Sequence, residues 1–219
     1  MKILALEFSS PQRSVAVVED HGPSVSEIIE TAPGHSMKPL GMVEAALKQA
    51  GLEREQIDCL AIGLGPGSYT GIRVAIALAQ GWQLARDVKL LGLSSAECVA
   101  ARAQADGFIG RVCVVIDAQR NEHYIASYEL GSGEHREMSP LRLAALAEVR
   151  ERERAGETLI GPEVTRWFRS GQVIFPQAAT LGRLALTRRV FVAGAKLEPI
   201  YLRETTFVKA VPPRILPAG

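Results

Sequence analysis

A glycine-rich run, Gly63-Leu64-Gly65-Pro66-Gly67-Ser68-Tyr69-Thr70-Gly71-Ile72-Arg73, separates two apolar segments of the chain. The segment before it, residues 57–64, is predicted to form a buried strand, and the segment after it, residues 72–86, a helix. A buried strand followed by a turn and a helix is the repeating unit of α/β folds. The turn then lies at the carboxyl end of a strand, where open α/β sheets usually place ligands.

The surrounding segments extend this α/β pattern. Strands are predicted for residues 2–8, 14–19, 25–31 and 89–93, and helices for residues 35–50 and 94–105. Gly51 ends the first of these helices, and Ser94 or Ser95 is the expected N-cap of the second. The resulting order, β-β-β-α-β-α-β-α, is that of a mixed α/β layer fold.

The opening pattern then returns in a shortened form. Residues 112–116 form an apolar strand closed by Asp117, and residues 124–128 alternate as a return strand, just as residues 3–6 are closed by Glu7 before the first hairpin. The repeat predicts two related halves, residues 1–106 and residues 107–219, of which the second is reduced. Residues 141–154 have helical spacing, and beyond them the pattern predicts no regular element.

Polar residues at the two hairpins and the glycine run form a candidate nucleotide or anion site. The two acids could face each other across a cleft between the halves, where carboxylates hold magnesium through water, while glycines and a helix N-terminus allow close approach of an anion. Neither a Walker loop nor a dinucleotide fingerprint is present. The alternative is a tight turn beside solvated strand ends. The candidates are Glu7, Ser9, Ser10, Gly65, Gly67, Ser68, Thr70 and Asp117.

The helix predicted after the glycine run is apolar on almost every side. From residue 72 to residue 85 its polar side chains are Arg73, Gln80 and Gln83. Such a helix is expected to be buried nearly all round, yet a sheet covers one face only. A second helix or another chain must cover the rest. We therefore predict an interface on residues 35–50 and 72–86, with the contacts Leu40, Val43, Leu47, Arg73, Ile76, Ala79 and Trp82.

Composition excludes several classes of protein. With 25 basic and 24 acidic residues, the formal charge of +1 predicts no strong nucleic-acid or membrane field. No apolar run approaches the length of a membrane helix. Cys59, Cys98 and Cys113 lie scattered in apolar runs, which indicates buried thiols in a reducing cytoplasm, and the four histidines lack metal-ligand spacing. Residues 181–219 are locally basic, as a solvated tail or a polyanion contact would be.

The sequence resembles the bacterial TsaB (YeaZ) family, the non-catalytic subunit of the tRNA threonylcarbamoyladenosine machinery. The likeness rests on the opening hairpin, on residues 35–36 and 65–73, on 92–97, on 116–118 with 122–124, and on the closing motif at 198–203. It implies an actin-like/Hsp70-like ATPase fold with two ribonuclease-H-like halves. It also implies a scaffold that binds a TsaD-type transferase, joins a TsaE-type ATPase, forms homodimers, meets tRNA through the complex and does not associate with membranes.

Two departures from related patterns bear on the chemistry. The family's first hairpin usually carries Asp-Thr-Ser/Ala-Thr, whereas this chain has Glu7, Phe8, Ser9 and Ser10, which are expected to crowd the phosphate position. The resemblance therefore implies no cofactor for the isolated chain, and ATP or ADP only at the junction with the partner. At the metal-binding histidine pair of the catalytic paralogue this chain has Ser95 and Val99, so no catalytic residue and no metal site are expected.

Two alternatives remain at the level of sequence. Relatives of this fold have been described as glycoprotease-type peptidases of family M22, a function that the absent histidine pair argues against. An autonomous ATPase of the sugar- or acetate-kinase type would need phosphate motifs in both halves. The second hairpin, Asp117-Ala118-Gln119-Arg120, lacks the glycines expected there.

Overall fold

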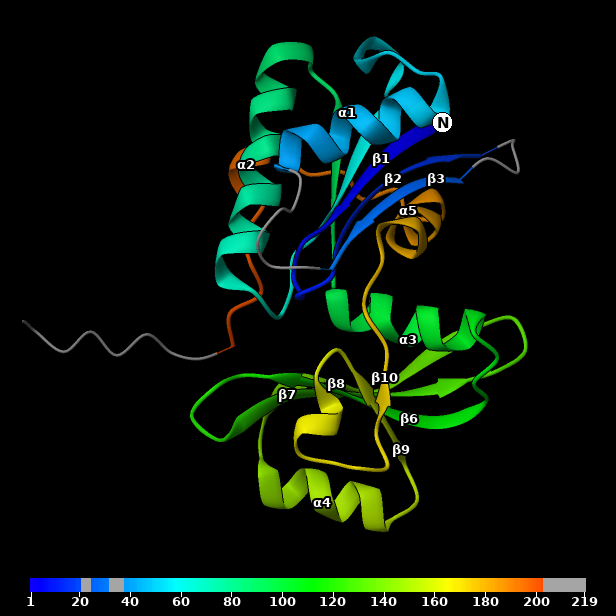
Figure 1. The fold of residues 1–219 in the computed structure, drawn as a ribbon, viewed down its shortest axis with the longest axis vertical. Coiled ribbons are helices and arrows are strands. Elements are labelled where there is room, and N and C mark those ends of the chain that lie inside the picture. Colours follow the sequence, from blue (N-terminus) through cyan, green and yellow to red (C-terminus); the bar gives the residue numbers. More distant parts are fainter. Residues whose placement is uncertain (21–24, 32–37, 203–219) are drawn as a thin grey trace, which may run out of the picture.

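The computed structural model describes residues 1–20, 25–31 and 38–202, which form two α/β lobes (Figure 1). Each lobe is built on a five-stranded sheet, with the orders β3-β2-β1-β4-β5 and β10-β9-β6-β7-β8. Read from its β8 edge, the second sheet has the order β8-β7-β6-β9-β10, in which each strand corresponds to the strand at the same place in the first sheet. The two related halves expected from the hairpin repeat are therefore confirmed.

The first sheet contains β1 (Lys2–Glu7), β2 (Arg13–Glu19), β3 (Val25–Glu30), β4 (Cys59–Gly63) and β5 (Lys89–Leu93). Strand β1 pairs antiparallel with β2 and parallel with β4. Alternate residues of β1 enter two different cores. Leu4 and Leu6 pack with helices α1 (Pro39–Ala50) and α2 (Tyr69–Arg86), whereas Ile3 and Ala5 pack with α5 (Ala178–Leu186). The sheet is covered on both faces, which explains why residues 3–6 of β1 and residues 59–63 of β4 carry no polar side chain.

The second sheet contains β6 (Gly110–Asp117), β7 (Glu122–Leu130), β8 (His135–Ala145), β9 (Thr158–Gly161) and β10 (Gln172–Val173). Helix α3 (Ser95–Ala105) lies between the lobes and packs on one face of this sheet, and α4 (Leu146–Arg154) covers the other (Figure 1). Short 3-10 turns lie at Arg54–Gln56, Val164–Arg166 and Gly194–Lys196. Ser94 caps α3 by accepting from the Glu97 N–H, as predicted.

Two expectations about the second half were wrong. Residues 141–145 belong to β8, and residues 142–145 pair with β7, so α4 begins only at Leu146, because cross-strand pairing outweighs their helical spacing. Helix α5 returns to the first sheet, where it packs on β1 and β2, so the assignment of all residues after 106 to a second half does not hold. Past α5, the Val192 N–H donates to the Leu90 carbonyl at the edge of β5.

The two predicted interface helices are present with shifted starts. Gly51, with a φ of 66°, ends α1 in the left-handed conformation, as expected. The predicted start of α1 at residue 35 lies outside the described residues, and the described helix begins at Pro39. Helix α2 begins at Tyr69, earlier than predicted, because Ser68 caps it through a 3.3 Å hydrogen bond from the Gly71 N–H.

Candidate functional site

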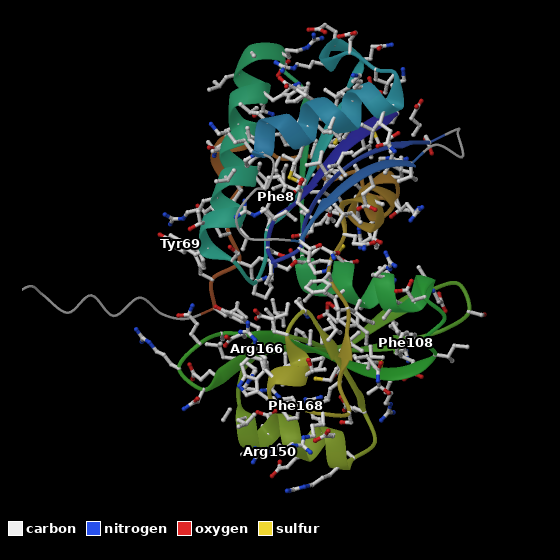
Figure 2. All side chains as sticks on the ribbon, viewed as in Figure 1. Phe8, Tyr69, Phe108, Arg150, Arg166 and Phe168 are labelled. Atoms are coloured by element: carbon white, nitrogen blue, oxygen red, sulfur yellow. The ribbon has the colours of Figure 1, made fainter. Side chains whose placement is uncertain are left out.

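A cleft of about 480 Å³ lies between the two lobes, where both hairpins end. Figure 2 shows Tyr69 on the upper lobe and Arg166 on the lower one. Six of the eight predicted anion-site residues lie together on its walls. The lining residues are Ser9, Ser10, Pro11, Arg13, Gly67, Ser68, Tyr69 and Thr70 from the first lobe and Ile116, Asp117, Gln119, Pro162, Glu163 and Arg166 from the second.

Glu7 does not reach the cleft, contrary to its prediction as a ligand. Its carboxylate is completely buried; Oε1 accepts from the Ser9 N–H at 2.8 Å and Oε2 from the Ser95 hydroxyl at 2.9 Å. Burial raises the pKa of Glu7, although the hydrogen bonds from Ser9 and Ser95 oppose that shift. A carboxylate held in this way is unavailable for magnesium or for water bound to magnesium.

Ser95 connects Glu7 to the glycine run. Its hydroxyl oxygen accepts from the Gly65 N–H at 3.2 Å, and its own N–H donates to the Gly65 carbonyl at 2.8 Å. Gly65 is therefore packed inside the lobe next to Glu7 and does not line the cleft. Sequence reasoning identified Ser95 as a possible N-cap and as a lost metal-binding position; its role in holding Glu7 depends on a contact across 88 positions of the chain.

Three glycines allow the loop to pack directly on the first hairpin. An added Cβ would lie 2.1 Å from the Glu7 carboxylate at Gly63, and 2.0 Å from the carbonyl oxygens of Ser9 and Phe8 at Gly67 and Gly71. The Ser68 N–H also donates to the Ser9 carbonyl at 2.6 Å. The loop backbone is thus used for contact inside the lobe, which favours the tight-turn interpretation over an anion cradle.

Phe8 does not crowd the cleft, which corrects a second expectation. Its ring is buried in the core beneath α1 and α2 (Figure 2). The side chains of Glu7 and Phe8 both point into the lobe. This wall of the cleft is lined instead by Ser9, Ser10 and Arg13.

The second hairpin contributes one half-buried acid and a buried histidine. The Asp117 carboxylate accepts from the Gln119 N–H at 2.7 Å, closing a turn in which Gln119, Arg120 and Asn121 have φ between 55° and 61°. Beside Asp117, His123 packs edge-on against Trp167 with ring centroids 4.7 Å apart. Neither His123 ring nitrogen has a hydrogen-bond partner in the described part of the chain. Burial lowers the pKa of His123, and the nearby Asp117 charge opposes that shift.

A second feature is an apolar groove of about 430 Å³ between α1 and α2, which we call the helix groove. Its lining residues are Leu40, Val43, Arg54, Glu55, Ala77, Leu78, Gly81, Trp82, Ala85 and Arg86. Leu40 is 56% exposed, and Leu84, on the outer side of α2, is 91% exposed. Helix α2 is therefore not buried all round: one side packs on the sheet and the other faces solvent.

The structure corrects the choice of contact residues on these helices. Leu47, Ile76 and Ala79 are buried in the core of this chain, because they form the side of each helix that packs on the sheet. Val43 is buried in the same core but also lines the floor of the helix groove. Leu40 and Arg73 are exposed, and Trp82 is partly buried at the groove. Sequence periodicity located the helices but not which side faces outward.

Other candidate chemistry is limited in the described residues. Cys59, Cys98 and Cys113 are buried free thiols, and burial raises the pKa of Cys59 and Cys113 to about 12. Within residues 1–20, 25–31 and 38–202, acids, histidines and cysteines do not gather in threes as metal ligands would. In these ranges, no helix has both the length and the apolar character that crossing a membrane requires.

Two lobes with one repeated strand order, whose hairpins meet at a shared cleft, define a protein of the actin-like ATPase-fold class. The family model TsaD, described as tRNA N6-adenosine threonylcarbamoyltransferase, matches residues 29–210. Because that match covers most of the chain, and because the TsaB protein described next is a near full-length relative, the chain belongs to the TsaD/TsaB (YeaZ) family.

The relatives span nearly the whole chain. The Escherichia coli K12 protein named tRNA threonylcarbamoyladenosine biosynthesis protein TsaB is 30% identical, with 97% of this chain and 99% of that protein covered. The Haemophilus influenzae protein of the same name is 26% identical, with 98% of each chain covered. The solved structure of YeaZ from Pseudomonas aeruginosa is 28% identical and covers 92% of this chain and 99% of that one, with a TM-score of 0.76.

Proposed function

We propose that this chain is a non-catalytic subunit in tRNA threonylcarbamoyladenosine biosynthesis, which binds a TsaD-type transferase and supports threonylcarbamoyl transfer to the adenosine beside the anticodon. The relatives that are named for this pathway support a role of this chain in the same pathway. The observation that carries the scaffold role is the helix groove, an apolar surface that this chain leaves in contact with solvent. Apolar patches on soluble proteins mark interaction sites.

The shape of the helix groove suits a close helix–helix contact. Ala77, Gly81 and Ala85 recur every four residues on the outer side of α2, and an added Cβ at Gly81 would meet no described atom within 4 Å. Small residues at this spacing let a partner helix approach closely. Trp82 and Leu40 supply larger apolar surfaces beside the stripe, and a buried Trp is a common anchor of interfaces.

The rim of the helix groove carries two ion pairs. Arg54 pairs with Glu44 at 2.8 Å, and Arg86 pairs with Glu55 at 3.0 Å. All four groups are already satisfied within this chain, and exposed ion pairs contribute little to binding energy. Affinity must therefore come from the apolar floor. A specific contact here would bury roughly 1,200–2,000 Å² in total.

The residues at the positions of the paralogue's histidine pair support a subunit without chemistry of its own. Ser95 is occupied by its hydrogen bonds to Glu7 and Gly65, and Val99 is buried in the apolar core against β6. Neither side chain offers the imidazole nitrogen that iron or zinc would need. No observation favours the peptidase or the autonomous ATPase over the scaffold role.

The complex that we propose has further members. A TsaE-type ATPase joins the pair, tRNA enters through the assembled complex, and ATP or ADP occupies the junction with the partner rather than this chain alone. The three buried free thiols fit a reducing cytoplasm. A homodimer would use the same groove, so homodimer and transferase complex would compete for it.

The test is capture of a purified TsaD-type transferase by the immobilised chain. A Gly81→Arg variant places a charge on the open groove, and we expect a folded protein that captures at least tenfold less transferase. Ala105→Arg, at the exposed end of α3, is the matched control and should capture normally. Undiminished capture by a folded Gly81→Arg protein would place the interface elsewhere.

A further inference from the structure

Two tyrosines and an arginine gather at the start of α2, on the rim of the cleft. The Tyr69 and Tyr201 rings stack with centroids 5.8 Å apart and 27° between their planes. The Arg73 guanidinium carbon lies 4.0 Å from the Tyr69 centroid and 6.0 Å from the Tyr201 centroid. We call Tyr69, Arg73 and Tyr201 the stacking platform.

The stacking platform is ordered and yet open to solvent. The Arg73 Nε–H donates to the Tyr201 hydroxyl at 3.3 Å, which holds the guanidinium close to both rings. Tyr69 nevertheless remains 56% exposed and Tyr201 44% exposed. Much of each ring is therefore uncovered even after the contacts within the platform are made.

The platform is not needed to attach the C-terminal segment to α2. That segment is held by the Ile200 N–H donating to the Leu64 carbonyl at 2.9 Å and by the buried side chain of Leu197. Further back, Gln80 donates to the Gly194 carbonyl at 2.9 Å, and Gln83 accepts from the Gly194 N–H at 2.7 Å. An anchor would bury its rings, so the exposed rings require a different explanation.

The cleft next to the platform offers partners for a phosphate. Ser68 and Thr70 supply hydroxyls, and Arg13 makes no ion pair with another described residue. On the opposite wall Arg166 is already paired with Glu163 at 3.3 Å. Glu163 and Asp117 give that wall two acidic side chains, which repel a phosphate. A phosphate would thus favour the first-lobe wall, between Arg13 and the platform.

We propose that the stacking platform binds an unpaired base of single-stranded RNA, with the adjoining phosphate directed toward Arg13 and Arg73. Exposed tyrosine rings and guanidinium planes are the surfaces on which single-stranded RNA stacks its bases. A planar base can lie on the part of the Tyr69 ring that Tyr201 and Arg73 leave exposed, while Arg73 adds cation–π attraction and charge. The choice of RNA rests on the proposed function, because the platform alone fixes only a planar base beside a phosphate.

The experiment uses the full chain and an oligouridylate of about eight nucleotides with one central 2-aminopurine. Uridine neighbours stack weakly, so the probe is bright in the free strand and its fluorescence falls when it stacks on an aromatic ring. We expect saturable quenching at low salt. Tyr69→Ala and Arg73→Ala should weaken binding about 5- to 150-fold. Tyr69→Phe, which keeps the ring, should bind like the wild type. Arg13→Ala should reduce the salt dependence of binding by about one phosphate contact.

Each contrary result has a distinct meaning. Absence of quenching with the wild-type chain, or equal binding by a folded Tyr69→Ala protein, would overturn the proposal. Competition by AMP as strong as that of the same oligonucleotide carrying adenine in place of 2-aminopurine would overturn the assignment to RNA and indicate a free-nucleotide site.

The same variants, tested for transferase capture, separate this proposal from the scaffold role. If the wild-type chain captures the transferase but does not bind RNA, the scaffold role holds and the RNA proposal fails. If the wild-type chain binds RNA but does not capture the transferase, the RNA proposal holds and the scaffold role fails. If Tyr69→Ala loses the transferase and keeps RNA binding, the platform is a protein contact and the RNA proposal is wrong.

Discussion

Replacing Gly71 by alanine tests whether the glycine loop is a packing device. Gly71 lies in the first turn of α2, directly against the buried residue that follows β1. An added Cβ would lie 2.0 Å from the Phe8 carbonyl oxygen and 3.0 Å from its carbonyl carbon. These are backbone atoms, so the strain cannot be relieved by rotating a side chain. The start of α2 must move away from the hairpin instead.

The cost can be set against a matched control on the same helix. Overpacking of a rigid contact costs roughly 1–3 kcal/mol, and the clash at Gly71 belongs at the upper end. Alanine recovers about 1 kcal/mol of helix propensity. The net loss is about 2 kcal/mol. At Gly81 an added Cβ meets no described atom within 4 Å, so Gly81→Ala should gain about 1 kcal/mol.

Thermal melts followed by circular dichroism at 222 nm measure both variants. For a chain of this length, 1 kcal/mol corresponds to roughly 2–4 °C in Tm. Gly71→Ala should therefore melt about 4–8 °C below the wild type, and Gly81→Ala about 2–4 °C above it. If Gly71→Ala melts at or above the wild-type temperature while Gly81→Ala behaves as expected, the loop does not pack as described.

Three further predictions concern buried groups. Burial raises the folded-state pKa of Glu7, so the folded chain binds more protons than the unfolded chain. The free energy of unfolding should therefore fall as pH rises through that pKa. Glu7→Gln should flatten this pH dependence in denaturant melts from pH 4 to 9. Burial lowers the folded-state pKa of His123, and the Asp117 charge opposes that shift. The free energy of unfolding should therefore fall as pH drops below about 6.5. This loss of stability should be smaller in His123→Phe, and an unchanged loss would mean that another group causes it. Ala79→Arg puts a charge into the core and should abolish folding, whereas Gly81→Arg should fold; gel filtration separates the two outcomes.

The sequence predicted the fold well where one segment alone determines its structure. The apolar runs of β1 and β4, the capping serine of α3 and Gly51 at the end of α1 all lie where local patterning indicated. Helix α5 was missed, although it is apolar and buried. Its position depends on contacts with β1 and β2, more than 150 residues away in the chain, which no local pattern encodes.

The sequence predicted most of the residues that meet at the cleft, but not the direction in which their side chains point. Sequence reasoning placed both acids at hairpin ends, and the structure brings the hairpins together, yet it turns Glu7 inward because Ser95 and the Ser9 N–H satisfy the carboxylate. The stacking platform was missed for a similar reason. Tyr201 belongs to the closing motif and Tyr69 to the glycine loop, and only the folded chain brings the two rings together.

The most direct test of the central claim is threonylcarbamoyl transfer to tRNA in a reconstituted reaction. We predict that this chain alone transfers nothing, that adding it to a TsaD-type transferase raises the rate at least tenfold, and that Gly81→Arg gives no such increase while Ala105→Arg does. Transfer by this chain in the absence of the transferase would contradict the non-catalytic role, and full stimulation by a folded Gly81→Arg protein would contradict the helix groove as the contact.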